Sequence, residues 1–295
     1  MILLYHLVFP DSTPPNAWNA GLVLRLKDFK RQLLWMKSFY RMVSLDEYFD
    51  QIQGKGKLNG RLAALTFDDC YSRTFDLVSP FLLDKGIPAT FFANTLHLEQ
   101  DSLLWFVYFN ALCFEKVYPE LLIDNIRYPL STQEECHKAW RTLIGNAKAS
   151  EDARTYSQCI SSAYPLPPEI VSKYRGLSQE QLRQIGTSPI LNVGGHTHSH
   201  PYLVQLSSDQ QFTEITYNKE LLERYSGKAV NHFAYTGGEY NSESILAVKK
   251  AGFKSGLAVR PKKITSDLVY ELPRTDIYGA SLVKFLVKIS GLNYA

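Results

Sequence analysis

Three histidines lie close together in residues 194–201, which read Gly-Gly-His-Thr-His-Ser-His-Pro. If this segment forms a helical turn, His196 and His200 point the same way and their imidazoles can share one metal ion. If it is extended, His198 faces the same side as both of them. The cluster therefore predicts a metal site and leaves the choice of ligand pair open. The alternative without chemistry is a polar surface loop.

Two adjacent carboxylates, Asp68 and Asp69, directly follow the apolar run 62–67. Groups at the C-terminal end of a parallel strand face the region where α/β folds place their active sites. One carboxylate can bind a metal ion, and the other can accept a proton from a water molecule on that ion. The alternative is that one of them caps the following helix.

These candidate residues stand within an alternation of apolar runs and helical patterns. Runs of strand length lie at 3–8, 62–67, 89–92, 191–193, 230–235, 256–259 and 269–272. Helices are indicated around 29–40, over about 74–85 before Gly86, and after the capping residues Ser131, Ser178, Ser207 and Asn241. Such alternation is typical of an α/β fold with parallel strands.

Between about residues 101 and 175 this alternation weakens. The segment opens with an aromatic stretch at 105–109 and continues into a helical pattern and a proline-rich stretch. We expect one catalytic domain over 1–295 that carries this segment as a large insertion. For the aromatic stretch we favour burial against the rest of the fold over a sugar-stacking lid, a membrane-surface contact or a dimer interface.

Composition narrows the class of protein. The chain of 295 residues is 45% hydrophobic and 21% charged, as expected for a folded globular protein. A net charge of +3, without long basic runs, indicates no nucleic-acid partner. No apolar run is long enough to predict a transmembrane helix.

Two features predict a cytoplasmic location. The first residues lack a basic segment and reach Pro10 and Asp11 early, which is not the pattern of a signal peptide. The four cysteines contain no C-x-x-C pair, as expected for reduced thiols.

Taken together, residues 66–69 (Thr-Phe-Asp-Asp) and 196–200 (His-Thr-His-Ser-His) resemble the first and second motifs of the polysaccharide deacetylase family, also called carbohydrate esterase family four. Weaker similarity continues through 233–238, through 272–274 and at Tyr5-His6. The resemblance covers most of the chain outside the insertion. It implies a deformed (β/α) barrel with the site at the C-terminal ends of the strands.

The resemblance also implies roles for individual residues. Asp69, His196 and His200 would hold one divalent metal ion, with zinc expected first and cobalt, nickel or iron possible for such a donor set. Asp68 would be the general base. Gly237 and Tyr235 would lie at the oxyanion and the substrate, whereas His198 falls on a variable position.

The chain departs from the family pattern in three places. Thr236 stands where a proline is expected, the arginine that usually orients the base is missing from its motif, and no histidine follows His232 as a general acid. We hypothesise that Arg274 replaces the missing arginine; the alternative is an ordinary surface arginine. His6, near the end of the first strand, is our first candidate for the general acid. The alternative is a supporting or core histidine, and we expect His232 to face the packing layer.

The sequence thus predicts a metal-dependent hydrolase that removes an N-acyl group, acetyl in the first instance, from an amino sugar. The expected partner is an N-acylated sugar or a sugar-linked precursor in the synthesis of a surface polysaccharide. Two alternatives stay open: hydrolysis of another amide, such as a formamido sugar or a cyclic imide, and a non-catalytic sugar-binding relative. The presence of both aspartates and both outer histidines favours the enzyme.

Overall fold

A parallel sheet forms the centre of the computed structural model, which describes residues 1–13, 24–100, 102–260, 267–279 and 281–290. Its strands follow the order β12-β11-β10-β9-β6-β5-β1-β13, and β4 also pairs with β5. Their bounds are β1 (Ile2–Tyr5), β4 (Arg41–Val43), β5 (Leu62–Phe67), β6 (Ala89–Ala93), β9 (Leu191–Gly195), β10 (His232–Ala234), β11 (Ser255–Ala258), β12 (Leu272–Pro273) and β13 (Thr275–Asp276).

The two edges of this sheet meet on one short segment. Strand β12 pairs with β11, strand β13 pairs with β1, and only Arg274 separates β12 from β13. The backbone N–H of Arg274 continues the ladder by donating to the carbonyl of Ala258 at 2.9 Å. The sheet is therefore a nearly closed, deformed (β/α) barrel, which confirms the predicted fold class.

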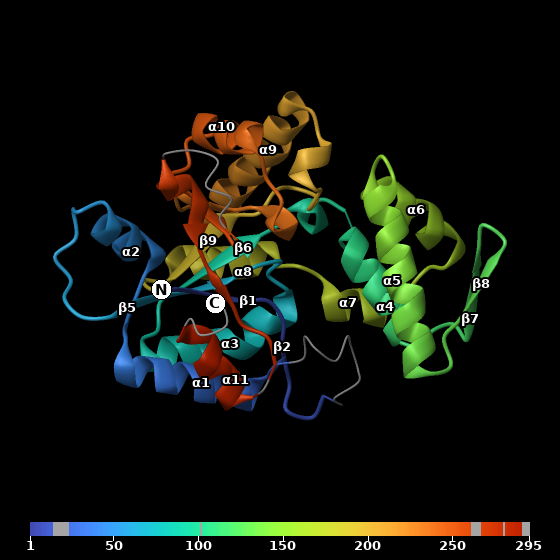
Figure 1. Cartoon of the computed structure of the whole chain (residues 1–295), viewed down its shortest axis with the longest axis horizontal. Helices are drawn as coiled ribbons and strands as arrows, with labels where there is room; N and C mark the ends of the chain where they lie inside the picture. The colour runs from blue at the N-terminus through green and yellow to red at the C-terminus, as the bar shows by residue number, and fades with distance from the viewer. Residues whose placement is uncertain (14–23, 101, 261–266, 280, 291–295) are drawn as a thin grey trace.

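Helices surround this barrel (Figure 1). They are α1 (Leu26–Phe39), α2 (Leu45–Ile52), α3 (Ser72–Lys85), α8 (Gln179–Thr187), α9 (Ser208–Ser226), α10 (Ser242–Lys250) and α11 (Leu282–Ile289). In α1, Phe29, Leu33 and Met36 recur at helical spacing and are fully buried, as the sequence predicts. Helix α3 ends as predicted at Gly86, which adopts the left-handed conformation that favours glycine.

Some predicted elements differ from the observed ones, and three of the differences have a clear reason. The first strand ends at Tyr5 because β2 (Val8–Phe9) leaves the barrel and pairs with β3 (Leu24–Arg25). The capping box expected at Ser131 is formed one residue later by Thr132 and Glu135, because the sequence allows two overlapping boxes. The apolar run 269–272 is mostly a 3-10 helix, η5 (Leu268–Glu271), since short apolar runs do not distinguish helix from strand.

Residues 105–174 form a separate group of elements beside the barrel (Figure 1, right). The group comprises α4 (Trp105–Phe114), β7 (Glu120–Ile123), β8 (Ile126–Pro129), α5 (Gln133–Ala149), α6 (Ala153–Ala163) and α7 (Pro168–Tyr174). It has its own hydrophobic cluster, in which Phe109, Leu112 and Leu143 are fully buried. Residue 101, where we expected the insertion to begin, lies outside the described residues. That this group is an insertion within one domain stays a prediction.

Among the described residues, no helix has both the length and the apolar composition that a bilayer requires.

Candidate metal centre

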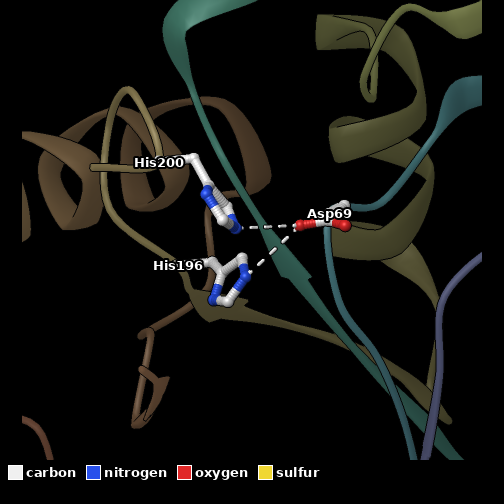
Figure 2. Close-up of side chains that lie close together, drawn as sticks. All are labelled: Asp69, His196 and His200. Carbon is white, nitrogen blue, oxygen red and sulfur yellow. Dashed lines mark ion pairs between the residues drawn. The ribbon is translucent and has the colours of Figure 1, made fainter. Parts of the chain in front are cut away.

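Asp69, His196 and His200 converge at the C-terminal ends of two barrel strands. Asp69 follows β5, and His196 directly follows β9. The Nε2 atoms of His196 and His200 lie 3.5 Å and 3.3 Å from Oδ1 of Asp69 (Figure 2). All three side chains are buried, and their potential ligand atoms lie within 4.8 Å of one another.

The residues of this trio fit a divalent metal ion. Oδ1 of Asp69 is buried and has no hydrogen-bond partner among the described residues. A buried carboxylate oxygen without a partner is costly, and a cation between it and the two imidazole nitrogens would satisfy it. One carboxylate and two imidazoles are a donor set that suits zinc and other first-row divalent metals.

His196 is held in the orientation that such a site requires. Its Nδ1 lies 2.7 Å from the carbonyl of Ala234, which can only accept, so Nδ1 carries the proton and Nε2 is left to face Asp69. Its backbone is held as well, because the N–H donates to the side chain of Asn218 at 3.0 Å and the carbonyl accepts from Asn94.

Two members of the trio occupy unusual backbone conformations. Asp69 has φ 60° and His200 has φ 59°, both in the left-handed region that side chains other than glycine rarely adopt. Thr197, with φ 61°, belongs to the same turn, and its hydroxyl accepts a hydrogen bond from the His200 N–H at 3.1 Å. Residues held this way cost about 1–3 kcal/mol each and cluster at functional sites.

His198 does not belong to the trio. Its Nδ1 lies 3.0 Å from the hydroxyl of Thr95, and its Nε2 lies 3.9 Å from the carboxylate of Glu99. The turn at Thr197 and His200 prevents the extended arrangement in which all three histidines would face one side. Only tertiary structure makes this choice between the two geometries that the spacing allows.

Asp68 forms a buried ion pair with Arg274. The two amino groups of Arg274 donate to the two oxygens of Asp68, both at 2.6 Å, and the Arg274 side chain is completely buried. Burial alone would raise the pKa of Asp68, but the Arg274 guanidinium and the nearby His196 outweigh it and lower that pKa. The alternative interpretation of Arg274 as a surface residue is therefore wrong.

The charge balance is similar at Asp69. Burial would raise its pKa, but the adjoining imidazoles of His196 and His200 outweigh burial and hold the pKa far below its usual range. Both carboxylates are thus ionised throughout the physiological range, as a ligand and a base require.

A model of the polysaccharide deacetylase family matches residues 55–256, which is more than half of the chain and includes Asp69, His196 and His200. The chain belongs to the polysaccharide deacetylase family. Arg274 and His6 lie outside the matched residues.

Individual relatives are distant. YxkH of Bacillus subtilis (strain 168) is 28% identical over 102 residues, and the match spans only about a third of each protein, 34% of this chain and 36% of the relative. The Streptococcus pyogenes deacetylase PplD, solved in complex with acetate, has a TM-score of 0.61 at 20% identity and covers 94% of this chain and 91% of its own. IcaB from Ammonifex degensii has a TM-score of 0.62 at 16% identity and covers 100% and 96%. These likenesses to solved structures support the barrel fold alone.

His6, our candidate for the general acid in this chain, follows β1 directly. Its ring stacks on Tyr278 with centroids 5.7 Å apart, and its Nδ1 is buried without a hydrogen-bond partner among the described residues. It lies beside Asp68 along the sheet, because Tyr5 pairs with Phe67 and the Asp68 N–H donates to the Tyr5 carbonyl at 2.9 Å. Its role stays a prediction.

Gly237 and Tyr235, which the resemblance places at the oxyanion and the substrate, differ in their surroundings. Gly237 has φ 62°, and a side chain there would meet the ring of Tyr202 at 2.7 Å. Tyr235 instead has both donors occupied, its hydroxyl by the carbonyl of Tyr270 at 2.9 Å and its N–H by that of Leu257 at 3.2 Å. Tyr235 therefore belongs to the packing of the barrel wall, with both of its donors used inside the protein. The expectation that Gly237 lies at the oxyanion stays a prediction.

Thr236, which stands where the resemblance predicts a proline, makes a hydrogen bond to the turn that follows His200. Its hydroxyl donates at 2.6 Å to the carbonyl of Pro201, the residue after His200. The departure thus adds a tether that proline cannot supply.

Sequence reasoning missed one set of contacts at the site. Trp105 and Phe106, at the start of α4, both contact His200, which lies 95 residues further from Trp105 along the chain. The aromatic stretch 105–109 was the available signal, but no local pattern indicates which loop it contacts.

Proposed function

We propose that this chain is a metal-dependent N-deacetylase that hydrolyses the acetamide of an amino sugar in a precursor of a surface polysaccharide. The observation that carries the proposal is the convergence of Asp69, His196 and His200 next to the buried Asp68–Arg274 pair. A metal site and an oriented base beside it are the two parts that amide hydrolysis of this kind requires.

Asp69, His196 and His200 would hold the metal, which when bound supplies Lewis acidity toward the acyl oxygen and lowers the pKa of a water molecule. Asp68 takes up a proton from the attacking water at a carboxylate oxygen as the water oxygen attacks the acyl carbon. Arg274 contacts both oxygens of Asp68, so it fixes the orientation of the base and keeps it ionised before the reaction.

The later steps concern negative charge on the acyl oxygen and a proton for the amine. The backbone N–H of Gly237 is our candidate donor to the acyl oxygen. The C–N bond then breaks, the acyl group leaves as a carboxylic acid, and the departing amine takes a proton from His6 or from protonated Asp68. The buried Nδ1 of His6, which has no hydrogen-bond partner in the described residues, supports its candidacy.

The buried Asp68–Arg274 pair favours a catalytic role over a non-catalytic sugar-binding role. Taking two charges out of water costs several kcal/mol, which is on the order of the energy gained from their attraction, so the pair is weak evidence for a purely stabilising purpose. A binding protein has no use for an oriented base beside its metal, whereas a hydrolase does.

The proposed location is the cytoplasm. All four cysteines are free, and Cys70, Cys113 and Cys136 are buried, which suits a reducing compartment. There the substrate would be a nucleotide-linked or lipid-linked precursor carrying an N-acetylated sugar.

The test combines metal analysis with product detection. Wild type, Asp68→Asn and His200→Ala would be assayed for bound metal and for acetate or formate released from a panel of nucleotide-linked N-acyl amino sugars. We expect acetate from wild type only, with metal kept by Asp68→Asn and lost by His200→Ala. Wild type that binds metal and sugar yet releases no acid would refute the enzyme hypothesis and support the non-catalytic sugar-binding protein. Formate in place of acetate would reassign the acyl group.

A further inference from the structure

Helix α4 contacts the metal-ligand candidate His200 in two ways. The indole N–H of Trp105 donates to the His200 carbonyl at 3.0 Å. The ring of Phe106 lies against the His200 imidazole, with centroids 4.6 Å apart. One contact holds the backbone of His200 and the other holds its ring.

The two histidines of the site differ in what supports them. His196 is held by groups of the barrel and its helices, namely the Ala234 carbonyl and the side chain of Asn218. His200 lies four residues further on, in a turn with a left-handed backbone conformation. Such a conformation persists only where neighbouring groups fix it, and α4 supplies two of those groups.

Helix α4 is itself firmly held by residues of 105–174. Phe109 and Leu112 are completely buried in the hydrophobic cluster that α4 shares with α5 and α6. Trp105 is 3% exposed and also packs its ring against Tyr202, with centroids 5.8 Å apart. The start of α4 is therefore packed in place where it contacts the turn that carries His200.

We propose that Trp105 and Phe106 are positioning residues for the metal ligand His200, so that the segment 105–174 completes the metal centre. The inference rests on the proposed metal centre and gives this segment a function beyond burial. Groups that orient metal ligands typically change metal affinity by about 10–100-fold when they are removed.

The test uses two conservative variants, each with a matched control. Trp105→Phe removes the indole N–H and keeps an aromatic ring, and its control is Trp140→Phe in α5, where the indole N–H has no hydrogen-bond partner in the described residues. Phe106→Leu removes the ring that contacts His200. Its control is Phe114→Leu, at the other end of α4, where the ring contacts His137 at 5.0 Å.

The dissociation constant for Zn²⁺ would be measured by competition with a chromophoric chelator, and the absorption spectrum of the Co²⁺-loaded protein would report loss of a ligand. We expect Trp105→Phe and Phe106→Leu to bind Zn²⁺ about tenfold more weakly and to change the Co²⁺ spectrum, with both controls unchanged. Circular dichroism would confirm that all variants are folded at the temperature used.

Wild-type affinity in both Trp105→Phe and Phe106→Leu would overturn the inference. Equal weakening in Trp140→Phe and Phe114→Leu would overturn it as well, because it would indicate general destabilisation. Because metal affinity is measured without substrate, the inference is judged separately from the proposed deacetylation. Wild type that binds Zn²⁺ but releases no acetate would refute only the latter.

Discussion

Arg274 joins the closure of the barrel to the proposed base. It is the residue between β12 and β13, the two short strands that pair with opposite edges of the sheet. From that position its guanidinium donates to both oxygens of Asp68 at 2.6 Å. The sheet therefore closes where the base is held, so damage to this pair should affect both stability and activity.

Replacing Arg274 by Met should destabilise the protein by about 3–5 kcal/mol, because it leaves the buried carboxylate of Asp68 without its partner. Urea unfolding measures this change in the free energy of unfolding. Arg183→Met is the control, since Arg183 pairs with Glu180 at 3.4 Å on the surface and such pairs contribute about 0–1 kcal/mol. Similar losses in the free energy of unfolding for both variants would show that the Asp68–Arg274 pair contributes no more than a surface ion pair.

Among the histidines of the loop, only His196 and His200 should be needed for metal binding. Alanine at either position removes an imidazole that faces Asp69, so metal should be lost on dialysis. His198→Ala is the control, because this ring contacts Thr95 instead. Metal analysis by mass spectrometry gives the stoichiometry. Loss of metal from the His198 variant would mean that the loop rearranges on binding.

His97 should make the stability of the protein fall in mild acid. Burial lowers the pKa of His97 from 6.5 to about 4, outweighing its hydrogen bond to the carbonyl of Leu177, which raises it. Between these values the unfolded chain binds a proton that the folded protein does not. The stabilisation that comes from the neutral, buried His97 is thus fully present above pH 6.5. As the pH falls toward 4 it is lost, and the free energy of unfolding drops by about 3 kcal/mol at most.

The variant His97→Gln tests this dependence. It should show a smaller drop in the free energy of unfolding than wild type between pH 6.5 and pH 4. Carboxylates that titrate in the same range contribute to both proteins and cancel in the difference. Parallel curves for the two proteins would show that His97 is not the group responsible.

Two helical glycines should respond oppositely to alanine. In α8, a Cβ on Gly186 would lie 1.9 Å from the carbonyl oxygen of Ser226 in α9, so Gly186→Ala should cost about 1–3 kcal/mol. In α5, a Cβ on Gly145 meets nothing within 4 Å, so Gly145→Ala should stabilise by about 0.5–1 kcal/mol. Thermal unfolding compares them. Stabilisation by both would mean that α8 and α9 can separate at little cost.

Local patterns were sufficient for much of the fold and for the members of the site. Strand β5 has the predicted bounds, and α3 ends at the predicted Gly86. Both follow from apolar periodicity and from the backbone preference of glycine, which depend on near neighbours in the chain. The resemblance to the family motifs implied Asp69, His196 and His200 as the ligands where spacing alone left the histidine pair open, and the structure brings these three residues together.

The sequence by itself therefore determined the α/β class from its alternating elements, and the barrel and the chemistry-bearing residues through the motif resemblance, whereas tertiary structure decided which groups face one another. The left-handed turn excludes His198 from the trio, barrel closure buries Arg274 against Asp68, and α4 contacts His200. Each of these relations joins groups through backbone geometry or through segments far apart in the chain. Periodicity and spacing carry no information about such contacts, because they arise only when distant elements pack into one structure.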